Sequence, residues 1–171
     1  LLKIQAAGNR AARMIRDLLD FTQARLGGGI PVERKASDIR EIVQQVVEEM
    51  ETTHPGRKVS VKHVGGARGE WDPDRLGQAI GNLVANALRH SPAGSHVSIR
   101  TDGDGERVEL EVHNVGEPIP DELRSRLFQP FQRGDGMRDR ASRSVGLGLY
   151  IVDHIVRAHG GEIDVRSSFD E

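Results

Sequence analysis

Apolar positions recur along the chain with two different periods. Between residues 2 and about 26 they return every three or four positions, which predicts a long amphipathic helix. Glycines at 27–29 follow this helix and indicate a flexible joint. A second helix is expected from about 38 to 52, with Asp38 and Glu41 forming a capping box at its start.

A period of two, typical of half-buried strands, separates these helical stretches. Residues 57–64 alternate in this way, and residues 30–36 are expected to form a short extended segment. Segments 96–102 and 107–115 alternate on either side of the turn sequence GDGE, which predicts an antiparallel hairpin. A last strand is expected to open at 162–168.

Three further helices complete the pattern. Asp72 as N-cap and Pro73 at the first helical position begin a central helix that contains GNLVANALRHSP. PDELRSRLF predicts a short helix, and the segment from Gly146 predicts a longer one that stops at Gly160. Residues 132–145 between them lack apolar periodicity and suggest a loop. Strands and helices without regular βαβ alternation favour an α+β layered domain with helices on one face of a sheet.

Composition excludes several kinds of partner and site. A net charge of −2 gives no basic field for nucleic acid or an anionic membrane surface, so neither contact is expected. The absence of cysteine excludes disulfides and thiolate metal sites and agrees with a cytoplasmic location. No apolar run is long enough to span a bilayer. Because the chain begins with Leu1, we expect it to be a piece of a longer protein.

The central helix has two expected faces. The core face comprises Leu76, Ile80, Leu83, Val84 and Ala87. The second face comprises Ala79, Asn82, Asn86, Arg89 and His90. An asparagine oxygen can join a Mg²⁺ shell beside phosphate oxygens without the repulsion that a carboxylate would bring. The spacing alone is more often that of two solvated or hydrogen-bonded amides, so further motifs are needed.

Three later motifs agree with a nucleotide site. Asn114 and Gly116 end a strand, where a short polar side chain can pair with a base edge and a glycine allows close approach. LFQPF places two phenylalanines, Phe128 and Phe131, before the loop. Gly146 and Gly148 open a helix, whose N-terminus favours phosphate. Taken alone each motif is weak, because a lone G-x-G is more often a packing device and the phenylalanines are more often core residues.

Taken in this order, the motifs resemble those of the ATP-binding catalytic domain of sensor histidine kinases. NLVANALRHS is similar to the N box, HNVGEPI to the G1 box, LFQPF to the F box and GLGL to the G2 box, over about residue 31 to the end. The resemblance implies a two-layer α/β sandwich of the Bergerat type, with a mixed sheet covered by helices on one face. ATP or ADP would lie between the central helix and a lid.

The resemblance also implies roles for individual residues. Asn86, and with it Asn82, would hold Mg²⁺ and phosphate, Arg89 and His90 would flank the nucleotide, and Asn114 would read adenine. Gly116 would line the adenine pocket, and the phosphates would face Gly146 and Gly148. The remaining expected nucleotide-binding residues are Ile119, Phe128, Leu147 and Leu149, and the lid arginines Arg133, Arg138, Arg140 and Arg143, among which none ranks above the others. Asn114 and Pro118 depart from the family, which usually has Asp and Gly there, so weaker adenine selectivity is expected.

Residues 1–28 resemble the second helix of the dimerisation and phosphotransfer hairpin, and residues 29–171 the catalytic domain. The intact protein would be a homodimer through this helix. It would transfer the γ-phosphoryl group of ATP to a histidine and then to an aspartate of a response regulator. None of the 7 histidines lies in an H-E-x-x-x-P setting, so this chain is expected to bind ATP without labelling itself. The alternative is a degenerate, non-catalytic module used for dimerisation or regulator docking.

Overall fold

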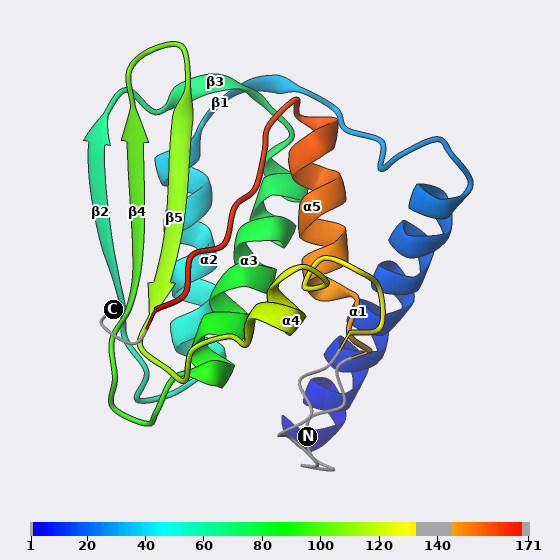
Figure 1. Cartoon of the computed structure of the whole chain (residues 1–171), viewed down its shortest axis with the longest axis vertical. Helices are drawn as coiled ribbons and strands as arrows, with labels where there is room; N and C mark the ends of the chain where they lie inside the picture. The colour runs from blue at the N-terminus through cyan, green and yellow to red at the C-terminus, as the bar shows by residue number, and fades with distance from the viewer. Residues whose placement is uncertain (1, 133–144, 169–171) are drawn as a thin grey trace. The chain divides into compact units, whose positions relative to one another are not determined.

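A computed structural model describes residues 2–132 and 145–168 as two compact units (Figure 1). One unit comprises Leu1–Pro31 and Asp121–Ile163, and the other comprises Val32–Pro120 and Asp164–Glu171. These two units are defined by the contacts within each of them. The expected domain boundary after residue 28 was instead placed at the glycine joint and by the family resemblance. That division therefore stays a prediction.

The second unit is built on a mixed sheet of three strands. The strands are β2 (Val59–Gly65), β4 (Val97–Gly103) and β5 (Val108–Asn114), in the order β2-β4-β5. β2 runs parallel to β4, and β4 pairs with β5 as the expected antiparallel hairpin. Helices α2 (Ile39–Thr53) and α3 (Pro73–His90) both lie on the same side of this sheet (Figure 1). The predicted fold class is confirmed.

A two-stranded sheet adjoins the start of α2. β1 (Lys35–Asp38) pairs antiparallel with β3 (Arg68–Trp71). The extended segment before α2 was expected, but β3 was not, because residues 68–71 include a glycine and are too few to show a period of two. The two strands hold together the entries into both helices, since Asp38 directly precedes α2 and Trp71 is followed by the N-cap of α3.

The core of the second unit lies between the sheet and the two helices. Alternate residues of β4, Val97 and Ile99, are buried against one cluster with the apolar faces of α2 and α3. Full burial of one such side chain contributes about 1.5–3 kcal/mol, more than a typical helix cap, so this cluster supplies most of the stability of the unit. Ala79, which was assigned to the polar face of α3, is also buried, and Leu83 is only half-buried. The assignment of Ala79 was wrong because this residue lies at the border between the faces, whereas Leu76, also on the core face, is half-buried like Leu83.

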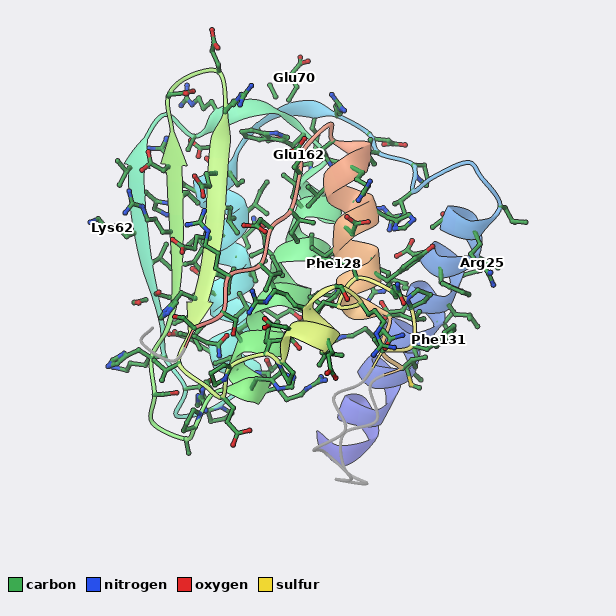
Figure 2. The ribbon with its side chains drawn as sticks, viewed as in Figure 1. Arg25, Lys62, Glu70, Phe128, Phe131 and Glu162 are labelled. Atoms are coloured by element: carbon green, nitrogen blue, oxygen red, sulfur yellow. The ribbon has the colours of Figure 1, made fainter. Side chains whose placement is uncertain are left out.

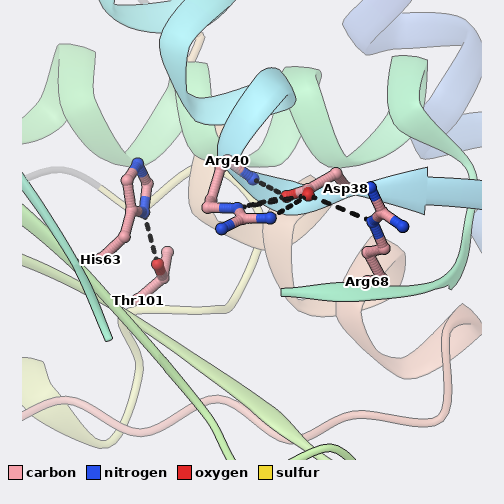
Figure 3. A network of polar contacts seen from close by, with 5 residues as sticks. All are labelled: Asp38, Arg40, His63, Arg68 and Thr101. Carbon is pink, nitrogen blue, oxygen red and sulfur yellow. Dashed lines mark hydrogen bonds and ion pairs between the residues drawn. The ribbon is translucent and has the colours of Figure 1, made fainter. Parts of the chain in front are cut away.

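Figure 3 shows the polar contacts at the start of α2. The carboxylate of Asp38 accepts a hydrogen bond from the backbone N–H of Arg40 at 3.0 Å, and it pairs with the Arg40 guanidinium at 2.5 Å. The hydrogen bond from the Arg40 side chain lowers the pKa of Asp38 to about 2. Among the described residues Glu41 makes no hydrogen bond back to Asp38, so only half of the expected capping box forms. In the same view the ring of His63 bonds the buried hydroxyl of Thr101 at 2.6 Å.

The first unit contains α1 (Leu2–Arg25), α4 (Asp121–Arg124) and α5 (Gly148–Ala158). α1 lies beside α5 (Figure 1). The expected N-terminal and C-terminal helices are therefore confirmed, and Gly160 at φ +80° ends α5 as predicted. In the part of the chain that the structure describes, no helix is both long and apolar enough to cross a bilayer.

The expected last strand does not form. Residues 162–168 run as irregular chain without ladder hydrogen bonds. A side chain of this segment bonds within the second unit instead, since the Ser167 hydroxyl oxygen accepts the Ile119 N–H at 2.9 Å. Alternation of apolar residues in this segment reflects half-burial rather than sheet pairing, which is why the prediction was wrong.

Candidate functional site

The start of α3 is fixed by Asp72. Its carboxylate accepts hydrogen bonds from the backbone N–H groups of Asp74 at 3.1 Å, Arg75 at 3.0 Å and Glu33 at 2.8 Å. Burial alone would raise the pKa of Asp72, but these three donors outweigh it and lower the pKa. The cap therefore ties α3 both to its own first turn and to the segment before β1.

The two asparagines of the N-box-like motif lie one turn apart on α3. Asn82 and Asn86 are both half-buried, whereas Arg89 and His90 at the end of the helix are exposed. The surrounding protein lowers the pKa of the His90 imidazole, and the adjacent Arg89 charge lowers it further. The ring is therefore neutral at neutral pH and adds no charge beside that of Arg89.

The loop after β5 packs against the end of α3. A Cβ atom added at Gly116 would lie 2.6 Å from the carbonyl oxygen of His90, closer than real contacts allow, so only glycine fits. The Asn114 side-chain amide donates to the Val115 carbonyl at 3.3 Å. With the amide nitrogen turned toward the backbone, the carboxamide oxygen is the atom left to accept a hydrogen bond from a ligand.

In the first unit, the two ends of the expected lid meet each other. The N–H of Phe131 donates to the carbonyl of Gly146 at 2.9 Å. Gly146 has φ +77°, and a Cβ there would lie 3.0 Å from the Gln132 carbonyl oxygen, so this glycine is required by both conformation and space. Leu147, the N-cap of α5, is buried and has no polar side chain with which to cap the helix.

Phe131, labelled in Figure 2, stands at one end of the expected lid and contacts an aromatic ring of α1. Phe131 has a positive φ of 64° and is 55% exposed, yet its ring meets Phe21 of α1 edge-on at 5.2 Å between centroids. Phe21 also meets Tyr150 of α5 at 5.6 Å. Phe128 is half-buried. The expected role of Phe128 beside the nucleotide stays a prediction.

The candidate residues therefore form two groups, each described within its own unit. The second unit holds Asn82, Asn86, Arg89, His90, Asn114, Gly116 and Ile119. The first unit holds Phe128, Gly146, Leu147, Gly148 and Leu149. The lid arginines Arg133, Arg138, Arg140 and Arg143 lie outside the described residues. The nucleotide-binding roles of all these residues stay predictions.

Two contacts at the site were not anticipated from the sequence. One is the bond from Ile119 to Ser167, and the other is a set of hydrogen bonds from Arg57 to the residues that follow α3. Ser167 is 48 positions from its partner and Arg57 is 34 positions from Ser91, so no local pattern pointed to either.

Comparisons with known proteins agree with the motifs. Residues 71–171 match the family described as histidine kinase-, DNA gyrase B-, and HSP90-like ATPase. The probable sensor histidine kinase TcrY of Mycobacterium tuberculosis is 35% identical over 97% of this chain and 35% of its own length. Sensor histidine kinase CusS of Escherichia coli K12 is 36% identical over 92% of this chain and 33% of its own. The chain thus spans about a third of these two relatives.

A solved structure gives the same result. Full-length ShkA in complex with AMPPNP superposes with a TM-score of 0.71 at 27% identity, covering 93% of this chain and 33% of that one. The chain belongs to the family of histidine kinase-, DNA gyrase B- and HSP90-like ATPases, and within it to the Bergerat-fold ATP-binding catalytic domains of sensor histidine kinases.

Proposed function

We propose that this domain binds Mg-ATP and positions its γ-phosphoryl group for transfer to a histidine that lies outside these residues. The observation that carries the proposal is the contact of Gly116 with the His90 carbonyl. It joins the loop that bears Asn114 to the end of the helix that bears Asn82 and Asn86. The amide proposed to read the base, Asn114, thus lies in a loop that packs against the helix of the two amides proposed to bind the phosphates, Asn82 and Asn86. All three belong to the second unit.

The donor chemistry of α3 fits a magnesium nucleotide. The oxygens of Asn82 and Asn86 are neutral, and both side chains are only half-buried, so they suit a shell shared with phosphate oxygens and water. The ion would neutralise charge on the phosphates. Arg89, exposed one turn beyond Asn86, supplies a fixed positive charge for the same phosphates.

The base and the phosphates would each have further contacts. The Asn114 oxygen accepts a hydrogen bond from the adenine amino group, while Gly116 and Ile119 shape the pocket. The start of α5, whose N-cap Leu147 makes no side-chain cap hydrogen bond, would favour phosphate through the helix dipole. Phe128 and the lid arginines complete the predicted set. Phosphoryl transfer then needs in-line positioning and charge neutralisation rather than covalent chemistry by these residues.

The acceptor and the partners follow from the same proposal. A histidine in a preceding helix of the longer protein would receive the phosphoryl group, and an aspartate of a response regulator would receive it next. The N-terminal helix would form the homodimer, since it exposes a row of large apolar side chains: Met14, Ile15, Leu18 and Leu19. We place this activity in the cytoplasm, where ATP is available.

Nucleotide titration with an alanine variant tests the proposal. Asn86→Ala should weaken Mg-ATP binding at least tenfold, equivalent to about 1.4 kcal/mol, because a ligand oxygen is lost. Gln44→Ala is the matched control, since Gln44 is a carboxamide on the exposed face of α2 whose amide bonds only Glu48 in the described structure. The chain should also phosphorylate a separately supplied histidine-bearing hairpin while leaving itself unlabelled. Absence of ATP binding by the unsubstituted chain, or of transfer to that hairpin, would contradict the proposal.

One observation favours a second function. Asn114 and Pro118 stand where the family usually has Asp and Gly, which is compatible with a degenerate pocket in a docking or dimerisation module. The same titration separates the two functions. A chain that fails to bind ATP or ADP at millimolar concentration would be such a module.

A further inference from the structure

Helix α3 ends without the usual glycine cap. Its C-cap, Ser91, is extended at φ −100° and ψ 141°, because the following Pro92 disfavours helical backbone in the residue before it. The last carbonyl groups of an α-helix have no N–H partner further along the helix, and in α3 the Ser91 hydroxyl donates to the Leu88 carbonyl at 3.5 Å. Pro92 has no N–H group and so cannot donate a hydrogen bond to these carbonyl groups.

Arg57, in the segment between α2 and β2, supplies donors to the two residues that follow α3. Its Nη1 donates to the carbonyls of Ser91 at 3.4 Å and Pro92 at 3.2 Å, and its Nη2 donates to the Ser91 hydroxyl. The guanidinium charge also lies at the negative end of the helix dipole. The Nε of Arg57 is buried and has no hydrogen-bond partner within the described residues. This uncompensated burial opposes the arrangement, so the contacts with Ser91 and Pro92 must outweigh it.

The helix end that Arg57 holds is the one on which the base-reading loop rests. The carbonyl of His90, directly before Ser91, is the atom that leaves no room for a side chain at Gly116. The same added Cβ would lie 3.3 Å from the Asn114 amide nitrogen. A continuous series of contacts therefore leads from Arg57 through the end of α3 to Gly116 and Asn114.

We propose that Arg57 is a positioning residue for base recognition: by fixing the C-terminal end of α3, it sets where the Asn114 carboxamide stands. The inference deepens the proposed function and depends on it for the role of Asn114. Arg57 touches neither the base nor the phosphates in this account. Its removal should therefore change discrimination between bases more than it changes phosphate binding.

The test compares Arg57→Met with Lys58→Met, which removes an exposed charge one residue further along. ATP and inosine triphosphate carry the same phosphates, but inosine has an oxygen where adenine has its amino group. Arg57→Met should lower the preference for ATP over inosine triphosphate at least threefold, Arg57→Lys should restore part of it, and Lys58→Met should leave it unchanged. If Arg57 had a purely structural role, Arg57→Met would lower the affinity for both nucleotides by the same factor.

A second measurement does not depend on nucleotide. In the ¹H–¹⁵N spectrum of the nucleotide-free chain, the Gly116 backbone signal and the Asn114 side-chain signals should shift in Arg57→Met and stay in place in Lys58→Met. Unshifted signals, or an unchanged preference between the two nucleotides, would overturn the inference. If the unsubstituted chain binds neither nucleotide, the proposed function fails and the spectrum alone decides about Arg57. If Arg57→Met does not fold, Arg57→Lys, which keeps the charge but loses the planar fork that reaches Ser91 and Pro92, is compared with Lys58→Met in the same two measurements.

Discussion

Replacement of Gly116 by alanine tests whether the base-reading loop rests on α3. The new Cβ would start 2.6 Å from the His90 carbonyl oxygen, while ordinary contact begins at 3.4 Å, so the loop or the helix end must move by about 0.8 Å. Overpacking of this kind costs about 1–3 kcal/mol, and the atoms involved are backbone, which cannot rotate away. The displaced loop carries Asn114, so we expect at least tenfold weaker ATP binding, about 1.4 kcal/mol.

Isothermal titration with ATP, together with thermal unfolding, measures the two effects of Gly116→Ala. Gly28→Ala is the matched control, because a Cβ at Gly28 meets nothing within 4 Å and its φ is ordinary. The control should leave both ATP affinity and the unfolding temperature unchanged. If Gly116→Ala binds ATP within twofold of the unsubstituted chain and unfolds at the same temperature, the loop does not depend on this contact and our account of the pocket is wrong.

Three further predictions concern the elements that support the site. Asp72→Ala should lower the free energy of unfolding by about 1–2 kcal/mol through loss of the α3 cap, measured in urea by the fluorescence of the adjacent Trp71. Asp38 has a pKa of about 2 in the folded chain, below its usual value of 3.8. Its contribution to the free energy of unfolding is therefore present above pH 3.8 and is lost as the pH falls through 2. The difference in stability between the unsubstituted chain and Asp38→Asn should therefore shrink over that range, and a constant difference would contradict the assignment. Phe21→Leu removes two edge-on ring contacts and should destabilise the first unit by about 1–3 kcal/mol, measured by the emission of Tyr150.

Much of the fold could be predicted because it depends on local signals. Alternation across residues 96–102 and 107–115 around GDGE identified the hairpin, and Asp72 followed by Pro73 identified the start of α3. These signals work because a strand or a helix shows its buried face within a few residues. The order of strands and helices then favoured helices on one face of a sheet, and the family motifs added that the sheet is mixed.

The parts that could not be predicted are contacts between distant segments. β3 has only four residues, and its partner β1 comes much earlier in the chain, so its identity depends on pairing rather than on its own pattern. The bond of Ile119 to Ser167 and the bonds of Arg57 to Ser91 and Pro92 are of the same kind. Residue types in the site were visible in the sequence, but the contacts that hold those residues in place were not.

The parallel pairing of β2 with β4 has a consequence for how the second unit assembles. Val59 meets Val97 only after the intervening chain, including all of α3, has crossed back along the sheet. β4 and β5 are joined by a short turn, so closing that hairpin costs far less chain entropy. We expect the hairpin to belong to the folding nucleus and β2 to join afterwards, which makes the refolding rate of the unit sensitive to the hairpin and its unfolding rate sensitive to β2.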